Sequence, residues 1–337
     1  MRSIFVSQQA GTVRSVYSEE TTKRLGEKFG LETDRVYTKE QILADPASFS
    51  DVTYVFSTWG MPSFTEDQIR AAFGRNLMAV FYAAGSVQGF ARPFLNCGVR
   101  VFSAWAANGV PVAEVTVAEI ILANKGMPMA ARLCSRNPES RGESIRYVRG
   151  TRGNYGARVG IIGVGMIGSM VCEMLKNYRL EVVAYDPFCP PEKAAALGVK
   201  LVSLPELFAT SDVISNHLAN NAQTRGMLDY ALFSSMKPFA VFINTGRGAQ
   251  VVEADLVRAL REETGRCAIL DVTDPEPAPA GSPWYELPNV ILTPHLAGSQ
   301  NDEWHRMSEY MADEADAFDA GLPTRYSVSL KMLETMA

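Results

Sequence analysis

The stretch that decides the fold is residues 158–186, which read RVGIIGVGMIGSMVCEMLKNYRLEVVAYD. It begins with a short apolar run at 159–162, which is typical of a strand buried on both faces. Three glycines follow in the pattern G-x-G-x-x-G, and these are Gly163, Gly165 and Gly168. Apolar residues at helical spacing come next, and a second apolar run at 182–185 ends at Asp186. This order of strand, glycine turn, helix, strand and acid predicts a dinucleotide-binding βαβ unit.

Each part of this stretch has a physical role in holding a dinucleotide. Gly163 permits the tight turn out of the strand, Gly165 lets the backbone approach a pyrophosphate, and Gly168 lets the helix lie close to the sheet. The free N–H groups at the start of the helix favour a phosphate anion. Asp186 can accept both hydroxyls of the adenosine ribose and would repel a 2′-phosphate, which favours NAD over NADP. A glycine motif alone also fits a turn that binds nothing, but the strand and the acid that follow favour the nucleotide site.

Length and composition exclude several classes of protein. The 337 residues are enough for two domains, and 47% of them are hydrophobic. The net charge is −5 and no Lys/Arg block occurs, which argues against nucleic acid or an anionic membrane as partner. The apolar run at 4–6 is too short for a signal peptide, and no apolar run approaches transmembrane length. The five cysteines form no C-x-x-C pair, so we expect no metal site, no disulfide framework and a cytoplasmic location.

The rest of the chain alternates strands and helices. Strands are predicted at 3–6, 35–37, 52–56, 77–83 and 100–102, and later at 212–217, 240–244, 268–272 and 290–293. Helices are predicted at 19–29, 40–44, 66–73, 90–96, 191–197 and 253–263. Such alternation indicates parallel sheets that are covered on both faces.

Three further segments connect these elements. A long helix is predicted to begin at Pro111 and to cross into the central domain. Residues 134–157 are polar and glycine-rich, and they predict a surface connection. The last helix, at 301–320, has one apolar face and is expected to pack back on the first domain.

Chemically useful side chains follow three of the predicted strands. Arg247 stands between glycines in a post-strand turn and could grip a carboxylate, although it also fits a surface turn. Asp271 and Glu276 belong to an acidic, proline-rich stretch that by itself suggests an exposed loop. His295 is one of three histidines and alone follows a predicted strand between a proline and a glycine. Together they make an acid/base set suited to hydride transfer to a ketone, which needs a proton donor for the developing alkoxide.

These segments resemble the D-isomer-specific 2-hydroxyacid dehydrogenases. The resemblance covers residues from about 77 onward and is clearest over 158–300. It is carried by the motifs VGIIGVGMIG, SDVISNHLANNAQTRGML, FINTGRGAQVVEADLVRAL, LDVTDPEP and NVILTPHLAGS. It implies two doubly wound α/β domains, with a Rossmann NAD-binding domain (105–299) inserted in a discontinuous flavodoxin-like substrate domain (1–104 plus 300–337). It also implies a homodimer with the crossing helix at its interface.

The resemblance assigns roles to individual residues. The catalytic residues would be Arg247, Glu276 and His295. The substrate carboxylate would be held by Arg247 and by the loop of Gly85, Ser86 and Val87. The cofactor contacts would be Ser86, Gly163, Gly165, Met166, Ile167, Gly168, Asp186, Leu218, Thr245, Gly246, Asp271, His295, Ala297 and Gly298. Many members have glycine at the position of Val87, alanine or serine at Gly246 and proline at Ala219, which leaves the substrate open.

Other assignments and functions remain open. His217 fits a structural role better than a catalytic one, and Trp59 and Trp105 fit either a pocket or core packing. The leading hypothesis is an NAD(H)-dependent oxidoreductase for a small D-2-hydroxy or 2-keto acid, related to glyoxylate and hydroxypyruvate reductases. The alternatives are a nucleotide-sensing binding protein of the same fold and a phosphite-oxidising relative.

Overall fold

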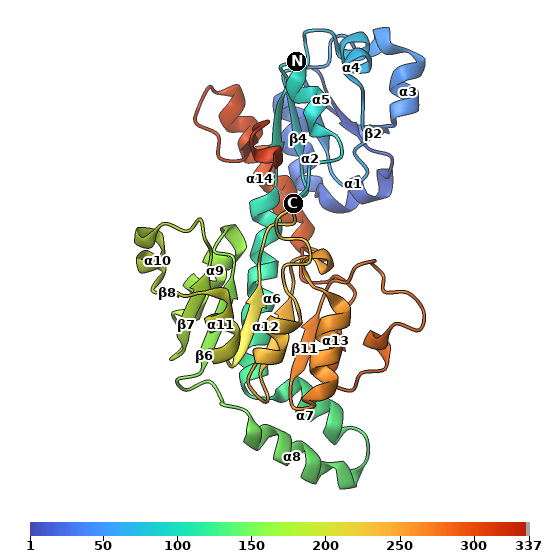
Figure 1. The fold of residues 1–337 in the computed structure, drawn as a ribbon. Helices are drawn as coiled ribbons and strands as arrows, with labels where there is room; N and C mark the ends of the chain where they lie inside the picture. The colour runs from blue at the N-terminus through green and yellow to red at the C-terminus, as the bar shows by residue number, and fades with distance from the viewer. Residues whose placement is uncertain (335–337) are drawn as a thin grey trace. The chain divides into compact units, whose positions relative to one another are not determined.

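The computed structural model describes residues 1–334, which form two compact α/β units (Figure 1). The first unit comprises Met1–Gly109 and the chain from Ser299 onward, and the second comprises Val110–Gly298. The sequence predicted boundaries at 104/105 and 299/300. The first boundary in the structure lies five residues later, and the second lies one residue earlier. The larger difference arises because the first boundary lies inside a continuous helix, where no break in the chain marks it.

The first unit contains a six-stranded sheet. Its strands are β1 (Ser3–Val6), β2 (Leu31–Tyr37), β3 (Tyr54–Ser57), β4 (Ala79–Tyr82), β5 (Arg100–Ser103) and β13 (Ser327–Val328). They lie in the order β13-β5-β4-β3-β1-β2, and only β13 runs antiparallel to its neighbour. The five parallel strands therefore have the order 2-1-3-4-5, which is the flavodoxin-like arrangement.

Six helices accompany this sheet: α1 (Ala10–Val16), α2 (Glu19–Phe29), α3 (Lys39–Ala44), α4 (Glu66–Phe73), α5 (Ala91–Asn96) and α14 (Glu303–Asp319). Short 3₁₀ turns lie at η1 (Pro46–Phe49) and η5 (Met332–Glu334). Thr65 and Gln68 form the capping box that the sequence predicts at the start of α4. Helix α1 was not predicted from the sequence, because it has only seven residues and no side-chain cap at its N-cap, Gln9.

The core of the first unit is built on a ladder of phenylalanines. Phe56, Phe81 and Phe102 are paired across β3, β4 and β5, and their stacked rings have centroids 5.2 and 4.9 Å apart. Phe318 of α14 packs edge-on against Phe102 at 5.4 Å. Arg24 of α2 also pairs with two carboxylates of α14, those of Asp313 and Asp316. The apolar face of the last helix therefore packs on the first unit, which explains why a segment so late in the chain belongs to it.

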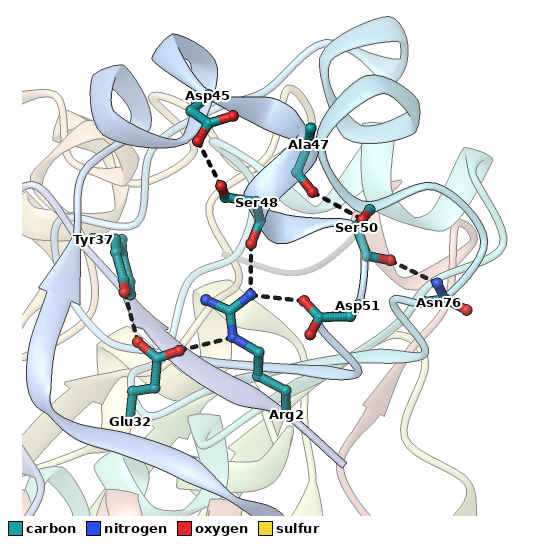
Figure 2. A network of polar contacts seen from close by, with 9 residues as sticks. All are labelled: Arg2, Glu32, Tyr37, Asp45, Ala47, Ser48, Ser50, Asp51 and Asn76. Atoms are coloured by element: carbon teal, nitrogen blue, oxygen red, sulfur yellow. Dashed lines mark hydrogen bonds and ion pairs between the residues drawn. The ribbon is translucent and has the colours of Figure 1, made fainter.

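A polar network ties the first strand to the loop after α3 (Figure 2). Nε of Arg2 lies 2.7 Å from Oε1 of Glu32, and its Nη1 lies 2.7 Å from Oδ1 of Asp51. Tyr37 donates a hydrogen bond to the other oxygen of Glu32, and Arg2 also donates to the carbonyl of Ser48. These two carboxylates raise the pKa of Arg2 above its ordinary value, so the guanidinium stays charged.

The long helix α6 (Trp105–Asn124) passes from the first unit into the second. The sequence predicted that it begins at Pro111, but the helix begins six residues earlier and Pro111 lies inside it. By length and composition α6 could cross a membrane, with a mean hydropathy of 1.4, so the expectation that no segment approaches that length is wrong. However, 44% of the hydrophobic window is buried, and Ala113, Val117 and Ile120 pack in the core of the second unit. Core helices share this composition, so α6 alone does not indicate a membrane.

The second unit contains a seven-stranded, fully parallel sheet. Its strands are β6 (Arg158–Ile162), β7 (Glu181–Tyr185), β8 (Lys200–Leu201), β9 (Val213–Asn216), β10 (Val241–Asn244), β11 (Cys267–Leu270) and β12 (Val290–Leu292). They lie in the order β8-β7-β6-β9-β10-β11-β12. This is the Rossmann order 3-2-1-4-5-6 with one added strand, and the order reverses between β6 and β9.

Helices cover both faces of this sheet. On one face lie α11 (Leu204–Thr210), α12 (Tyr230–Ser235) and α13 (Glu253–Glu262). On the other lie α6, α7 (Met127–Cys134), α8 (Arg141–Gly150), α9 (Met166–Leu175) and α10 (Pro191–Leu197). Short 3₁₀ turns occur at η2 (Pro138–Ser140), η3 (Gly248–Gln250) and η4 (Pro283–Tyr285). Residues 134–157, which the sequence predicts as a polar surface connection, contain η2 and α8, which were not predicted. The polarity of this segment reflects a helix that buries only one side, at Ser144 and Tyr147.

Candidate functional site

The glycine-rich turn after β6 has the geometry of a phosphate site. Gly163 has a φ of +85°, which L side chains rarely adopt, and a Cβ on Gly168 would lie 2.0 Å from the carbonyl oxygen of Gly163. Both glycines are therefore required by the fold itself. A Cβ on Gly165 would meet nothing within 4 Å, so packing within the chain does not require a glycine there. The predicted approach of a pyrophosphate to Gly165 therefore stays a prediction, and Met166 and Ile167 form the first turn of α9.

Asp186 follows β7 and is fixed by two backbone donors. Its Oδ2 accepts a hydrogen bond from the N–H of Val164 at 2.8 Å, and its Oδ1 accepts one from the N–H of Phe188 at 2.9 Å. The carboxylate is thus tied to the glycine turn on one side and to its own following turn on the other. Its remaining lone pairs suit the hydroxyls of a ribose whose phosphate sits at the start of α9.

Buried amides hold the turn that carries Arg247. Asn216, at the end of β9, donates to Oδ1 of Asn244 at 3.0 Å and to Oε1 of Gln250 at 2.6 Å. Asn244, at the end of β10, donates to the carbonyl of Arg247 at 3.1 Å. None of these three amides was predicted from the sequence as a site residue. Their signal was present, since each is a polar residue at the end of an apolar strand or in the turn that follows it.

The guanidinium of Arg247 is available to an anion. It donates to the carbonyl of Gly246 at 2.8 Å and forms no ion pair with any residue between 1 and 334. Gly248 is required beside it, because a Cβ there would lie 2.1 Å from the backbone of Thr273. A partly buried guanidinium without an acidic partner is well suited to bind a carboxylate with its planar fork.

Asp271 serves as a clamp for the loop that carries His295. The carboxylate is buried at the end of β11; its Oδ1 accepts from Thr293 at 2.6 Å and from the N–H of Leu296 at 2.8 Å. Its Oδ2 accepts from the N–H of Ala297 at 2.9 Å. The predicted nicotinamide contact of Asp271 stays a prediction, and the structure adds this positioning role.

His295 and Glu276 form a direct pair. Nδ1 of His295 lies 2.6 Å from Oε1 of Glu276, and both side chains are partly exposed. The backbone of His295 has a φ of +55°, in the left-handed region that residues other than glycine rarely adopt. With Nδ1 bound to the carboxylate, Nε2 remains to exchange a proton with a substrate. The structure therefore brings together the histidine and the glutamate that the sequence predicted as partners.

A second, unpredicted carboxyl lies near Asp271. Glu119 belongs to α6, and its Oε2 is buried without a hydrogen-bond partner among the described residues. Burial and the nearby carboxylate of Asp271 raise the pKa of Glu119 to about 8. One turn earlier, the hydroxyl of Thr116 lies 3.0 Å from that of Thr245, at the end of β10. Glu119 is thus a protonated carboxyl at neutral pH, close to the strand ends that carry the site.

The other residues predicted in this unit have structural partners. Nε2 of His217 lies 2.9 Å from the hydroxyl of Ser215, and desolvation lowers the pKa of His217 to about 4. A neutral histidine held by its own strand fits the structural role that the sequence favoured. Leu218 accepts a hydrogen bond from Gln250 through its carbonyl at 2.7 Å, while Ala297 is buried and Gly298 follows it.

The residues predicted to bind the substrate in the first unit follow β4. Gly85 and Ser86 are at least partly exposed, whereas the side chain of Val87 is buried in the core, so only its backbone can reach a ligand. Trp59 packs edge-on against Trp304 with ring centroids 5.8 Å apart, and Trp105 against Tyr326 at 5.7 Å. The two tryptophans therefore take part in packing of the first unit.

Metal ligands do not gather in the described chain. Among residues 1–334, no three His, Cys, Asp or Glu side chains lie together in a way that could hold a metal ion. All five cysteines are free thiols.

The sequence of the second unit matches a known family. Residues 127–297 match the model of the D-isomer specific 2-hydroxyacid dehydrogenase, NAD binding domain. The chain belongs to the D-isomer specific 2-hydroxyacid dehydrogenases. The second unit is therefore the domain that binds the nicotinamide cofactor in this family, in agreement with the glycine turn and Asp186.

Individual family members support the assignment. The chain is 32% identical over 241 residues to D-3-phosphoglycerate dehydrogenase of Archaeoglobus fulgidus, a match that covers 70% of this chain and 44% of that protein. It is 35% identical over 167 residues to glyoxylate reductase of Korarchaeum cryptofilum, covering 50% of each. The chain thus spans about half the length of the curated relatives that it matches.

Solved structures support the fold. The apo structure of D-mandelate dehydrogenase from Rhodotorula graminis aligns with a TM-score of 0.80 and 20% sequence identity, covering 97% of each chain. At that identity the likeness concerns the architecture alone. Both predicted sheet arrangements, and the two-domain α/β fold class, are confirmed.

Proposed function

We propose that this dehydrogenase uses NAD(H) to interconvert a small D-2-hydroxy acid and its 2-keto acid. The single observation that carries the proposal is the 2.6 Å pair between Nδ1 of His295 and Oε1 of Glu276. Such a pair orients the imidazole and leaves Nε2 for the substrate, as an acid/base catalyst at a carbonyl requires. Family membership and the nicotinamide-binding domain support the same conclusion.

In this proposal each residue has a distinct task. Arg247 binds the substrate carboxylate and orients the carbonyl, because its guanidinium has no acidic partner among the described residues. Nε2 of His295 donates a proton to the carbonyl oxygen during reduction and takes it back during oxidation. Glu276 fixes the ring from the other side, and Asp271 holds the loop in place. The nicotinamide, when bound, supplies or accepts the hydride.

We propose NAD rather than NADP as the cofactor. The carboxylate of Asp186 stands where the adenosine ribose would lie and is already fixed by two backbone N–H groups. A 2′-phosphate would bring a second negative charge against this carboxylate, whereas a hydroxyl would donate to it. The charge of Asp186 therefore supports a preference for NAD.

Steady-state kinetics tests the proposal. The purified protein would be mixed with NADH and, one at a time, glyoxylate, hydroxypyruvate, pyruvate, phenylpyruvate and 2-oxoisocaproate, and the oxidation of NADH followed. We expect turnover with at least one of these acids and a D product on chiral analysis. Tight NADH binding with no turnover on any acid would favour a nucleotide-sensing protein instead, and NAD reduction with phosphite alone would favour the phosphite-oxidising alternative.

We also propose that the protein is a homodimer. An apolar groove lies among α6, α7 and α8, and Leu122, Met127 and Val148 are 39, 47 and 38% exposed along it. A contiguous apolar surface of this kind is typical of protein interfaces. Size-exclusion chromatography with light scattering would measure the mass, and Leu122→Glu is expected to convert a dimer into monomers.

A further inference from the structure

The most exposed large apolar side chain between residues 1 and 334 belongs to Phe188. Its exposed fraction is 83%, compared with 76% for Tyr155 and 64% for Met1. A phenyl ring that stays in water adds no hydrophobic stabilisation to the fold, because that free energy is gained only when the ring leaves water. A fully exposed phenylalanine in an ordered turn therefore suggests a surface that a ligand or partner covers.

The turn that presents Phe188 is bound to the nucleotide site. The N–H of Phe188 donates to Oδ1 of Asp186 at 2.9 Å, and the N–H of Cys189 donates to the carbonyl of Asp186 at 3.3 Å. Nearby, Nζ of Lys193 in α10 donates to the carbonyl of Val164 in the glycine turn at 2.6 Å. The backbone of Phe188 is thus fixed relative to the two groups that are expected to hold the cofactor's ribose and pyrophosphate.

The position of Phe188 in the sheet determines which part of a dinucleotide it can meet. It lies two residues after Asp186, beyond the carboxyl end of β7, on the side of β6 away from β9, β10 and β11. Arg247 and His295 follow β10 and β12, on the other side of β6. A nucleotide with its phosphate at the start of α9 and its ribose at Asp186 therefore directs its base toward Phe188 and its other end toward the catalytic residues.

We propose that the ring of Phe188 stacks on the adenine of the bound cofactor and positions that end of the dinucleotide. The inference rests on the proposed function, because it takes the ligand to be an adenine dinucleotide. An aromatic ring recognises a base through its π-face and through the apolar area that both surfaces bury, without hydrogen bonds. Phe188 would then contribute to binding of the adenosine half and not to the chemistry at the nicotinamide.

Binding of fragments of the cofactor separates this role from others. Dissociation constants would be measured by calorimetry for NADH, AMP and reduced nicotinamide mononucleotide, which has no adenine. Phe188→Ala is expected to raise the dissociation constants of AMP and NADH by roughly tenfold or more. The dissociation constant of the mononucleotide should stay unchanged. Phe188→Tyr is expected to retain the affinity of the natural protein within about twofold, because a phenol ring stacks equally well.

A matched control is available on the same sheet. Tyr155 is almost as exposed as Phe188 but precedes β6, at the amino ends of the strands, where no cofactor contact is expected. Tyr155→Ala should therefore leave all three dissociation constants unchanged. Thermal unfolding of Phe188→Ala should match the natural protein, since an exposed ring contributes little to the core.

Several results would overturn the inference. Equal affinity for AMP in Phe188→Ala and in the natural protein would contradict the stacking role. An equal loss of affinity for AMP and for the mononucleotide would contradict it as well. A change of oligomeric mass in Phe188→Ala with unaltered AMP binding would assign the ring to a protein interface. Failure of the proposed function is distinguishable, because the natural protein would then bind NADH without turning over any keto acid.

Discussion

Nδ1 of His295 lies 2.6 Å from Oε1 of Glu276, although nineteen residues separate them in the chain. The loop that carries His295 is held by the carboxylate of Asp271, which accepts the N–H groups of both Leu296 and Ala297. The loop on one side of the His295–Glu276 pair is therefore held by a further carboxylate, that of Asp271. Removing each of the three should affect catalysis in a different way.

Replacement of His295 by alanine should lower turnover by roughly 10² or more, because the proton donor for the carbonyl oxygen is lost. The affinity for NADH should change little, because binding of the cofactor does not require proton transfer. Fluorescence titration with NADH would measure it. Glu276→Gln keeps an oxygen that can accept from Nδ1 but removes the charge, so we expect a smaller loss of turnover. A turnover number unaffected by His295→Ala would remove this residue from the mechanism.

Replacement of Arg247 by alanine should raise the KM for the keto acid most. The guanidinium has no acidic partner in the described chain and is free to pair with the substrate. Without it, the substrate carboxylate would have no ion pair with Arg247, and the substrate would bind more weakly. Arg247→Lys should recover only part of the affinity, because an ammonium group cannot bind both carboxylate oxygens with a planar fork. If only the affinity for NADH falls, while the KM for the acid stays constant, the assigned carboxylate role is wrong.

Replacement of Asp186 by asparagine should relax the preference for NADH over NADPH. The amide oxygen can still accept one of the N–H groups of Val164 and Phe188, so the glycine turn should keep its shape, while the repulsion of a 2′-phosphate disappears. The ratio of kcat/KM for the two cofactors is the measurement. A ratio that does not move in Asp186→Asn or Asp186→Ala would argue against the ribose contact.

The buried carboxyl of Glu119 should make stability depend on pH. Its pKa is about 8 in the folded protein and near the ordinary value of 4.5 in the unfolded chain. Between these two values the folded state holds a proton that the unfolded state has released, so raising the pH favours unfolding. The free energy of unfolding should therefore fall as the pH rises through this window, by at most roughly 1.4 kcal/mol per pH unit, and level off above about pH 8.

Urea unfolding at several pH values would measure this dependence. Glu119→Gln should flatten it, because an amide does not titrate. Glu114, an exposed carboxylate on the same helix, provides the control, and Glu114→Gln should leave the slope as it is. The same slope in Glu119→Gln as in the natural protein would show that this carboxyl is ionised or exposed in the folded state.

Local sequence patterns predicted most elements because their physical causes are local. Helices α2 and α4 have the residue bounds that the sequence predicted, since each begins at a hydroxyl that caps it and buries one apolar stripe. The patterns failed for α8, where a polar segment folds as a helix against α7. They failed again before Pro111, because Asn108 and Gly109 suggested a break in the chain, although both residues lie within α6.

The sequence alone predicted the glycine turn and the strand, helix and strand around it, and its motifs gave the acid/base residues that we propose. These follow from short-range rules: a positive φ favours glycine, and residues that follow a strand at the carboxyl edge of a parallel sheet are placed where ligands bind. Only the tertiary structure decided which groups touch. The hydrogen bonds of Asp271, the amide network of Asn216 and the burial of Glu119 join residues from distant parts of the chain. Burial, together with the carboxylate of Asp271, raises the pKa of Glu119, and neither can be read from a local pattern.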